Sequence, residues 1–128
     1  MDATFDDRES LLRAVWPANQ RPKFWENGHL SSAALKDPKG LSVNRTYDRP
    51  MRDSVEWMVK HFQGAIVSIT VPACLEVGAY IKYCPSETNA YHCEIHESKT
   101  SVLLNDTQAR ILAQSAKLEY EPNSAFLV

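Results

Sequence analysis

Short apolar segments that end at proline or glycine are the feature that most constrains how this chain folds. Leu11–Trp16 stops at Pro17, and the β-branched segment Ala65–Val71 is bounded by Gly64 and Pro72. Such segments, rich in β-branched residues and bounded by turn formers, are typical of strands. The same pattern predicts further strands, with a short edge strand last, at residues 29–35, 41–46, 77–84, 90–98 and 118–120.

Two segments have the apolar spacing of helices. The first covers residues 54–62, where Asp53 and Glu56 form a capping-box pattern. The second begins at Asn105 or Asp106, where Gln108 is placed to reach back to the cap. Its buried stripe is predicted to consist of Ala109, Leu112, Ala113 and Ala116. Strands and helices that come in runs, without strict β-α-β alternation, favour an α+β fold with a small, largely antiparallel sheet and two main helices.

The length of 128 residues suits a single compact domain. We expect a polar N-terminal segment over residues 1–10, a single α+β domain over 11–122 and a C-terminal tail over 123–128. The acidic N-terminus lacks a hydrophobic run, and no segment is long and apolar enough to cross a membrane. These features predict a cytoplasmic, soluble protein without membrane contact.

The formal net charge of -2 argues against non-specific nucleic-acid binding, which depends on clustered Lys and Arg. A local basic patch stays open, because Arg45, Arg49 and Arg52 lie close together in the sequence. The three cysteines lie in or beside apolar stretches, and no two have the CxxC spacing of a zinc or redox site. We therefore predict buried thiols and no metal at Cys74, Cys84 and Cys93, and the sequence names no cofactor.

The strongest local pattern is the alternating run His92-Cys93-Glu94-Ile95-His96. Alternation along a strand places His92, Glu94 and His96 on one face. Positions four apart in a strand are about 13 Å apart, so one ion cannot bind both histidines without a bend. At most His92 with Glu94, or Glu94 with His96, could form a pair, and a third ligand would have to come from elsewhere. A polar face turned to water, a catalytic or binding histidine and a metal ligand all stay open.

Arg13 interrupts an otherwise apolar strand. Because burying an arginine alone is costly, such a residue is usually paired or projects to a ligand. Its planar fork suits phosphate or carboxylate. The alternative is that Arg13 pairs with Asp37 or Glu94 and holds strands together.

A second polar stretch, Ser31 to Asp37, combines small hydroxyl residues with alanines and precedes Leu41-Ser42-Val43. Small side chains let the backbone approach another surface closely, and Lys36 could neutralise an anion. Ser31, Ser32 and Ser42 are therefore candidate ligand-binding residues.

These stretches together resemble a family of small, uncharacterised bacterial proteins that has no established activity. The resemblance runs from Leu11 to Lys117 and is carried by the strand with Arg13, a Ser-Ser-Ala-Ala-x-Lys-Asp stretch, a Leu-Ser-Val stretch and an Asn-x-x-His stretch. It implies one shared pattern of Arg13, Ser31, Ser32, Lys36, Asp37, Ser42 and His92. His96 stands where the family pattern has glycine, which argues against a shared two-histidine metal site.

Three functions follow as hypotheses. The first is binding of, or action on, a phosphate-bearing ligand such as a nucleotide, an NAD-like molecule or a nucleic-acid end, with Arg13 and Lys36 on the anion and His92 as acid or base. If the ligand is NAD, the order Arg13, Ser31, Glu94 is similar to the Arg–Ser–Glu order of many ADP-ribosyltransferases.

The second hypothesis is that the protein is a partner-binding accessory or neutralising subunit. Its apolar patch would consist of Trp16, Phe24 and Trp25 or of the tail 125–128. The third is a nucleic-acid binder that uses arginines 45, 49 and 52.

Overall fold

The computed structural model describes residues 4–122, so the predicted C-terminal tail lies outside the described residues. Six antiparallel strands form the main sheet in the order β6-β7-β4-β1-β5-β8. Their bounds are β1 Ser10–Val15, β4 Leu41–Arg45, β5 Ala65–Thr70, β6 Tyr80–Tyr83, β7 His92–His96 and β8 Lys117–Tyr120. The strands β2 Trp25–Glu26 and β3 His29–Leu30 form a separate hairpin.

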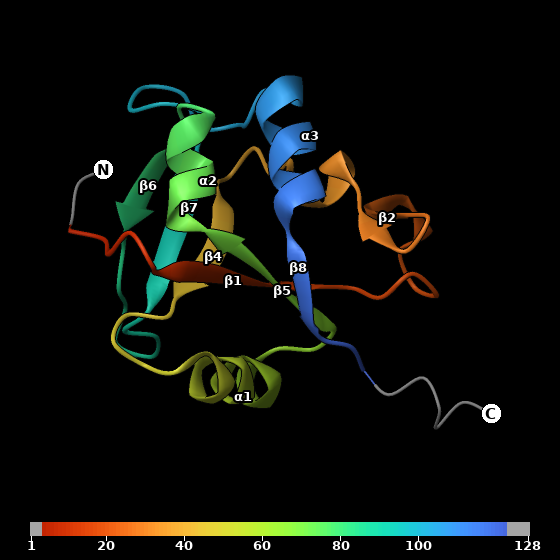
Figure 1. The fold of residues 1–128 in the computed structure, drawn as a ribbon, viewed down its shortest axis with the longest axis horizontal. Helices are drawn as coiled ribbons and strands as arrows, with labels where there is room; N and C mark the ends of the chain where they lie inside the picture. The colour runs from red at the N-terminus through yellow and green to blue at the C-terminus, as the bar shows by residue number, and fades with distance from the viewer. Residues whose placement is uncertain (1–3, 123–128) are drawn as a thin grey trace.

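Helices cover both faces of the sheet (Figure 1). The helices are α1 Met51–His61, α2 Val71–Glu76 and α3 Asp106–Ser115, with short 3-10 turns at η1 Pro22–Phe24 and η2 Ser32–Leu35. In Figure 1, α1 lies below the sheet, and α2 and α3 lie above it. The predicted α+β fold, with its largely antiparallel sheet and two main helices, is confirmed.

The two faces of the sheet bury unequal amounts of apolar surface. The larger core lies between the sheet and the α2–α3 side, where Leu11, Val43 and Ile95 pack with Leu112. The smaller core, under α1, centres on Leu12, Met58 and Ile66. Because α1 packs mainly on β1 and β5, this face of β4 and β7 is left to polar side chains.

Helix starts differ in how well the sequence predicted them. The capping box between Asn105 and Gln108 is confirmed. The cap predicted at Asp53 is wrong, because α1 begins after Pro50, whose fixed φ suits a helix entrance. The helix α2 was not predicted. Thr70 caps it by accepting a hydrogen bond from Ala73 N, so the proline after β5 begins a helix instead of a loop.

The strand predicted over residues 29–35 is only partly formed. β3 ends at Leu30, and Ser32–Leu35 turns into the 3-10 segment η2. This turn places Ala34 and Leu35 in the core and aims the Ala34 carbonyl at β1.

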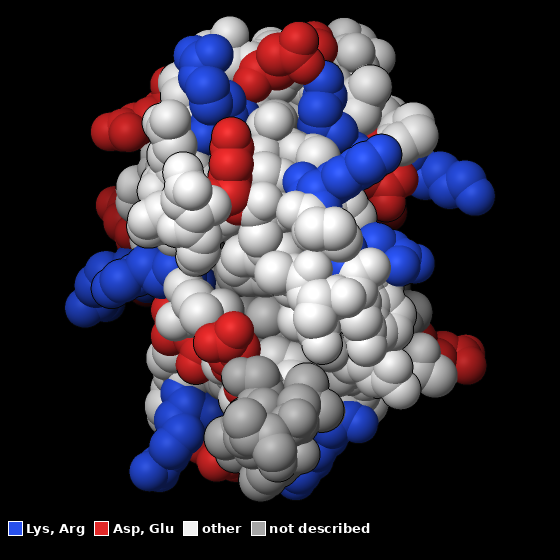
Figure 2. Space-filling model, turned by 90° about the vertical axis from the view of Figure 1, so that its right-hand side faces the viewer, with Lys and Arg blue, Asp and Glu red and all other residues white. Residues whose placement is uncertain are grey.

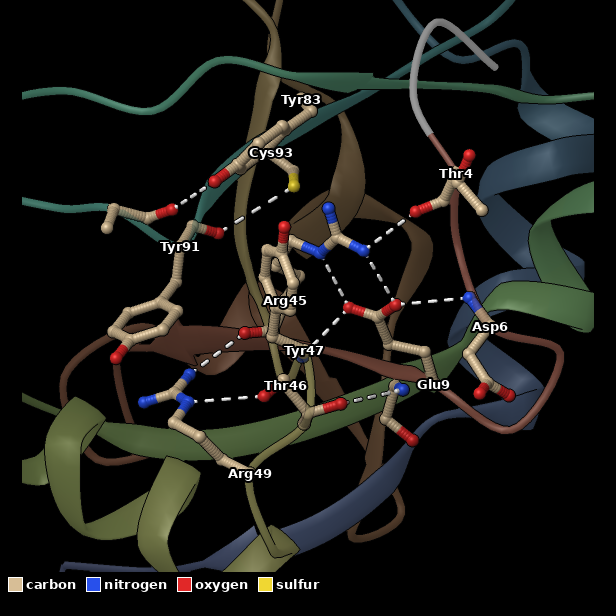
Figure 3. Close-up of polar contacts among 12 residues, drawn as sticks. Thr4, Asp6, Glu9, Arg45, Thr46, Tyr47, Arg49, Tyr83, Tyr91 and Cys93 are labelled. Atoms are coloured by element: carbon tan, nitrogen blue, oxygen red, sulfur yellow. Dashed lines mark hydrogen bonds and ion pairs between the residues drawn. The ribbon is translucent and has the colours of Figure 1, made fainter.

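Residues 5–9, expected within a polar segment ahead of the domain, contribute to the folded body. Phe5 packs in the larger core, and Glu9 is 3% exposed. Glu9 accepts hydrogen bonds from Arg45 Nε at 2.7 Å and Arg45 Nη2 at 2.9 Å. Figure 3 shows this pair, with Arg45 also donating to the Thr4 carbonyl and the backbone N–H of Tyr47 donating to Glu9.

Aromatic rings close the surroundings of this ion pair. The Arg45 guanidinium lies 4.2 Å from the Phe5 ring centroid, 3.9 Å from that of Tyr47 and 4.9 Å from that of Tyr83. Burial raises the pKa of Glu9, but the hydrogen bonds from Arg45 and from Tyr47 N–H outweigh it and hold the pKa below its ordinary value. The pair is therefore charged, buried and enclosed on several sides.

Charges of both signs are mixed on the surface seen in Figure 2, where Lys and Arg stand among Asp and Glu around an uncharged central area. Among residues 4–122, no helix combines the length and apolar character that a membrane crossing requires.

Candidate functional site

A cavity of about 560 Å³ opens where α1 leaves the sheet uncovered. Its floor is formed by Ser42 and Asn44 of β4, with Arg13 of β1 on one side and His92 of β7 on the other. The C-terminal half of α1 and the β6–β7 loop form its walls. Three residues that the sequence singled out, Arg13, Ser42 and His92, thus line one cavity.

Arg13 lies where two strands separate. β1 pairs with β4 at Leu11 and Leu12 only, and the two strands then diverge. Arg13 bridges the gap, donating from Nε to the Ala34 carbonyl at 3.2 Å and from Nη1 to the Ser42 carbonyl at 2.9 Å. Its side chain therefore fixes three segments of the chain relative to one another.

The charge of Arg13 is not neutralised by a contacting carboxylate. In the described part of the chain no ion pair involves Arg13, so the alternative in which Asp37 or Glu94 pairs with it by direct contact is not observed. Burial lowers the pKa of Arg13, and the charge of Asp37 opposes this effect without forming an ion pair. Within residues 4–122 its Nη2 has no hydrogen-bond partner and is not buried. One charged donor group is thus left for a ligand.

His92 is held by contacts on both ring nitrogens. Nε2 lies 3.3 Å from Ser42 Oγ, and Nδ1 lies 3.0 Å from the Cys84 carbonyl and 3.3 Å from Cys84 Sγ. Because the Cys84 carbonyl can only accept, its contact is a hydrogen bond when Nδ1 carries the proton of the neutral ring, and Nε2 then accepts from the Ser42 hydroxyl. Because Ser42 also supplies the carbonyl that Arg13 binds, one residue positions both candidate groups.

The α1 wall of the cavity is aromatic, and sequence reasoning missed it. Trp57 and His61 stack with their ring centroids 3.8 Å apart, and Phe62 lies beside Trp57. All three line the cavity. Neither Trp57 nor His61 was among the residues that the sequence predicted to bind a ligand. Their four-residue spacing on one helix face was the available signal.

In the Asn-x-x-His stretch, the asparagine, Asn89, also helps to shape the cavity. Asn89 and Asn44 exchange hydrogen bonds between their side-chain amides at 2.9 and 3.3 Å. Asn89 also accepts from Tyr91 N. These contacts tie the β6–β7 loop to the buried Asn44 of β4 and so set the position of the cavity wall.

The remaining ligand-binding candidates lie elsewhere. Ser31 and Ser32 line a second hollow of about 270 Å³ against α3, and Ser31 donates to the Lys23 carbonyl. Lys36 forms an ion pair with Asp106 at the start of α3. None of these three residues lines the cavity of Arg13 and His92, although Arg13 contacts the Ala34 carbonyl in the same stretch.

Glu94 lies on the same sheet face as His92, as strand alternation predicted, but outside the cavity lining. Its Oε1 is 2.8 Å from His96 Nε2. Since Ser31 and Glu94 do not share the cavity of Arg13, the Arg–Ser–Glu order has no common site here.

The structure supports only part of the predicted apolar partner-binding patch and of the predicted arginine surface for nucleic acid. Trp16 is 40% exposed, whereas Phe24 and Trp25 are half-buried against the core, and the predicted apolar tail lies outside the described residues. Arg45 is buried in its ion pair with Glu9 and offers no charge to nucleic acid.

The thiols differ in their surroundings. Cys74 and Cys93 are buried as predicted, and burial raises the pKa of each to about 12. Cys84 is half-buried and lies against His92 instead.

Comparisons of the chain with protein-family models, with curated proteins and with solved structures found no match. The resemblance drawn from the sequence motifs therefore stays a prediction, and the geometry of the cavity is the basis for function.

Proposed function

We propose that this protein acts in the cytoplasm by binding a small phosphate-bearing ligand in the cavity between β4, β7 and α1, and that it transfers a proton there. One observation carries the proposal: an arginine with an uncommitted charged donor, Arg13, shares a cavity with Ser42 and His92.

Arg13 supplies the anion contact. A guanidinium group offers directional N–H donors that suit phosphate oxygens, and charge-assisted hydrogen bonds are stronger than neutral ones. Its bonds to two backbone carbonyls hold the side chain in place before a ligand arrives. Little side-chain entropy is then lost on binding, which favours affinity.

His92 supplies the proton. Its Nε2 lies next to Ser42 Oγ on the cavity floor, within reach of a ligand that occupies the cavity. A histidine held between two polar neighbours is suited to general acid–base work, because its orientation is fixed by the bond on the opposite nitrogen.

The aromatic wall narrows the ligand class. A cavity of about 560 Å³ falls within the range of ligand pockets, roughly 300–1,000 Å³. Trp57 and its stacked partner His61 add a planar surface that a base or another flat ring can pack against. A nucleotide, with one anionic and one flat part, matches both features.

The test is a thermal-shift screen of the full chain against inorganic phosphate, nucleoside mono- and diphosphates, and NAD. A ligand at a hundred times its Kd stabilises the folded state by about 2.7 kcal/mol. We expect one phosphate-bearing class to raise Tm, and the shift to disappear in Arg13→Gln and to shrink in Trp57→Ala. Lys36→Gln is the matched control, since Lys36 lies outside the cavity.

A shift retained in Arg13→Gln, or lost equally in Lys36→Gln, would contradict this site. If no member of the panel stabilises the well-folded protein, the partner-binding alternative becomes the better explanation, and pull-down experiments would follow. Product analysis of any stabilising ligand, with His92→Gln for comparison, separates binding from turnover.

A further inference from the structure

Three potential metal ligands converge on the uncovered face of β6 and β7. Within residues 4–122, ligand atoms of Cys84, His92 and Glu94 all lie within 4.8 Å of one another. The three side chains are half-buried, so they are both shielded and reachable. The third ligand that the strand pattern lacked is thus the thiol of Cys84.

The hairpin between β6 and β7 brings these residues together. Cys84 N donates to the His92 carbonyl at 3.0 Å, so the two residues are neighbours across the strands. Strand alternation then places Glu94 beside His92 on the same face. Cysteine, histidine and glutamate therefore come from a short stretch of chain, ten residues apart at most (94 − 84 = 10).

The spacing suits a single ion. Zinc binds sulfur at about 2.3 Å and nitrogen or oxygen at about 2.0–2.2 Å, so two tetrahedral ligands stand roughly 3.5 Å apart. Cys84 Sγ and His92 Nδ1 are 3.3 Å apart. One carboxylate oxygen of Glu94 lies within 4.8 Å of the thiol and of a ring nitrogen of His92, so one ion could contact all three residues.

Neighbouring residues contact Glu94 and His92 in the way that outer-shell residues orient metal ligands. His96 Nε2 contacts Glu94 Oε1, and among the described residues Glu94 Oε2 has no hydrogen-bond partner. Ser42 Oγ contacts Nε2 of His92, the nitrogen opposite the one beside the thiol. Such outer contacts fix the tautomer and orientation of metal ligands.

Gly40 makes room for the Glu94 carboxylate. A Cβ at this position would lie 2.4 Å from Glu94 Oε1, and the backbone φ of +113° is one that glycine adopts readily. Because Gly40 has no side chain, the Glu94 carboxylate can lie against the backbone just before β4.

We propose that Cys84, His92 and Glu94 form a zinc site with three protein ligands, which leaves the fourth tetrahedral position open. Thiolate, imidazole and carboxylate are all zinc ligands, and three protein ligands are typical of zinc sites that keep an exchangeable position. This site goes beyond the proposed phosphate-binding function, with which it shares only His92.

Zinc binding also has a consequence for the cavity. Zinc on Nδ1 replaces the hydrogen bond from Nδ1 to the Cys84 carbonyl, and the proton of the neutral His92 ring is then on Nε2, beside Ser42. In the zinc-bound protein His92 therefore donates a hydrogen bond into the cavity, and in the metal-free protein it is able to accept a proton there.

The first experiment is titration of the metal-free full chain with Zn²⁺ in competition with a chromophoric chelator. Co²⁺ is then added in place of Zn²⁺ to record its absorption spectrum. We expect one equivalent of metal per chain and a thiolate-to-cobalt charge-transfer band. Cys84→Ser should remove that band and weaken Zn²⁺ binding by at least about tenfold, and Glu94→Gln should weaken binding while keeping the band.

Two controls test the identity of the site. Cys74→Ala removes a buried thiol that lies outside the cluster, and His29→Gln removes an exposed histidine, so both should bind Zn²⁺ as the wild type does. Circular dichroism of each variant shows whether it has folded. If Cys84→Ser does not fold, the Zn²⁺ affinity of Glu94→Gln relative to the wild type tests the site instead.

Failure of the two proposals can be told apart. Arg13→Gln should lose phosphate-ligand stabilisation and keep Zn²⁺, whereas Cys84→Ser should do the reverse. Absence of stoichiometric binding, or equal binding by the wild type, Cys84→Ser and Glu94→Gln, would overturn the zinc site and leave a thiol–imidazole hydrogen bond.

Discussion

Arg13 and Arg45 lie on neighbouring strands of the same sheet, in β1 and β4, yet their donors are used differently. Arg45 meets a carboxylate, a backbone carbonyl and three aromatic rings, and it is 4% exposed. Arg13 donates to two carbonyls and lines the cavity, and within residues 4–122 its Nη2 has no hydrogen-bond partner. A charge enclosed by the protein is a structural element, whereas a charge that is held in place but not neutralised is available to a ligand.

The difference arises from what covers each arginine. Residues 4–9 fold over Arg45 and bring the opposite charge with them (Figure 3). Arg13 leaves β1 on the same face as its cross-strand partner Val67, contacts the Ala34 carbonyl, and lines the cavity where β1 and β4 separate. Within residues 4–122 no segment brings a carboxylate into contact with it. Sequence position alone does not separate the two cases, because both arginines stand in apolar, strand-forming segments.

The largest effect is expected at the enclosed arginine. Arg45→Met leaves the Glu9 carboxylate buried without a partner, which typically costs about 3–5 kcal/mol of unfolding free energy. Urea denaturation measures this loss. The double variant Arg45→Met with Glu9→Leu should recover much of it, because no buried charge is left. A loss below about 1 kcal/mol would mean that Glu9 escapes to water and that the pair is not enclosed.

Acid should weaken the same pair. The pKa of Glu9 is below its ordinary value, so the folded state binds that proton less readily than the unfolded state does. The contribution of Glu9 is therefore complete above the unfolded pKa and is lost as pH falls through the folded pKa. Thermal unfolding from neutral to acidic pH should show a smaller decline in Glu9→Gln than in the wild type. Glu87→Gln, at an exposed loop position that forms no ion pair among residues 4–122, should decline as the wild type does.

A smaller stability effect is expected at the open arginine. Arg13→Gln removes hydrogen bonds to two carbonyls but strands no buried carboxylate, so we expect a loss of about 1–2 kcal/mol in urea denaturation. If Arg13→Gln loses as much unfolding free energy as Arg45→Met, then Arg13 contributes to stability as Arg45 does, and the contrast between the two arginines is wrong.

The smallest effect is expected at the cavity floor. The Ser42 side chain is exposed, so Ser42→Ala should change the unfolding free energy by less than about 0.5 kcal/mol. Ser68 of β5 is the matched buried serine, with its hydroxyl 2.6 Å from a Glu119 carboxylate oxygen, and Ser68→Ala should cost about 1 kcal/mol. Similar losses in the two variants would show that the cavity floor is not open.

Most of the secondary structure follows from local patterns of residues. Strands β1, β4 and β5 and the capping box of α3 follow from β-branched segments, turn residues and a local hydrogen-bond pattern, all of which act within a few residues. The same alternation correctly placed His92 and Glu94 on one face of β7. Local patterns predict these elements because the interactions that form them connect residues close together in the sequence.

Which polar residues contact one another depends on how distant segments pack, and local patterns do not show this. Glu9 reaches Arg45 across 36 positions, and Arg13 reaches the Ser42 carbonyl across 29, because strand order and register bring distant segments together. Lys36 was expected beside Arg13, but η2 turns it toward α3, while Cys84 reaches His92 through the β6–β7 hairpin. A site consists of such non-local contacts. Residue types and spacing indicate its candidates, and the pairing of strands selects among them.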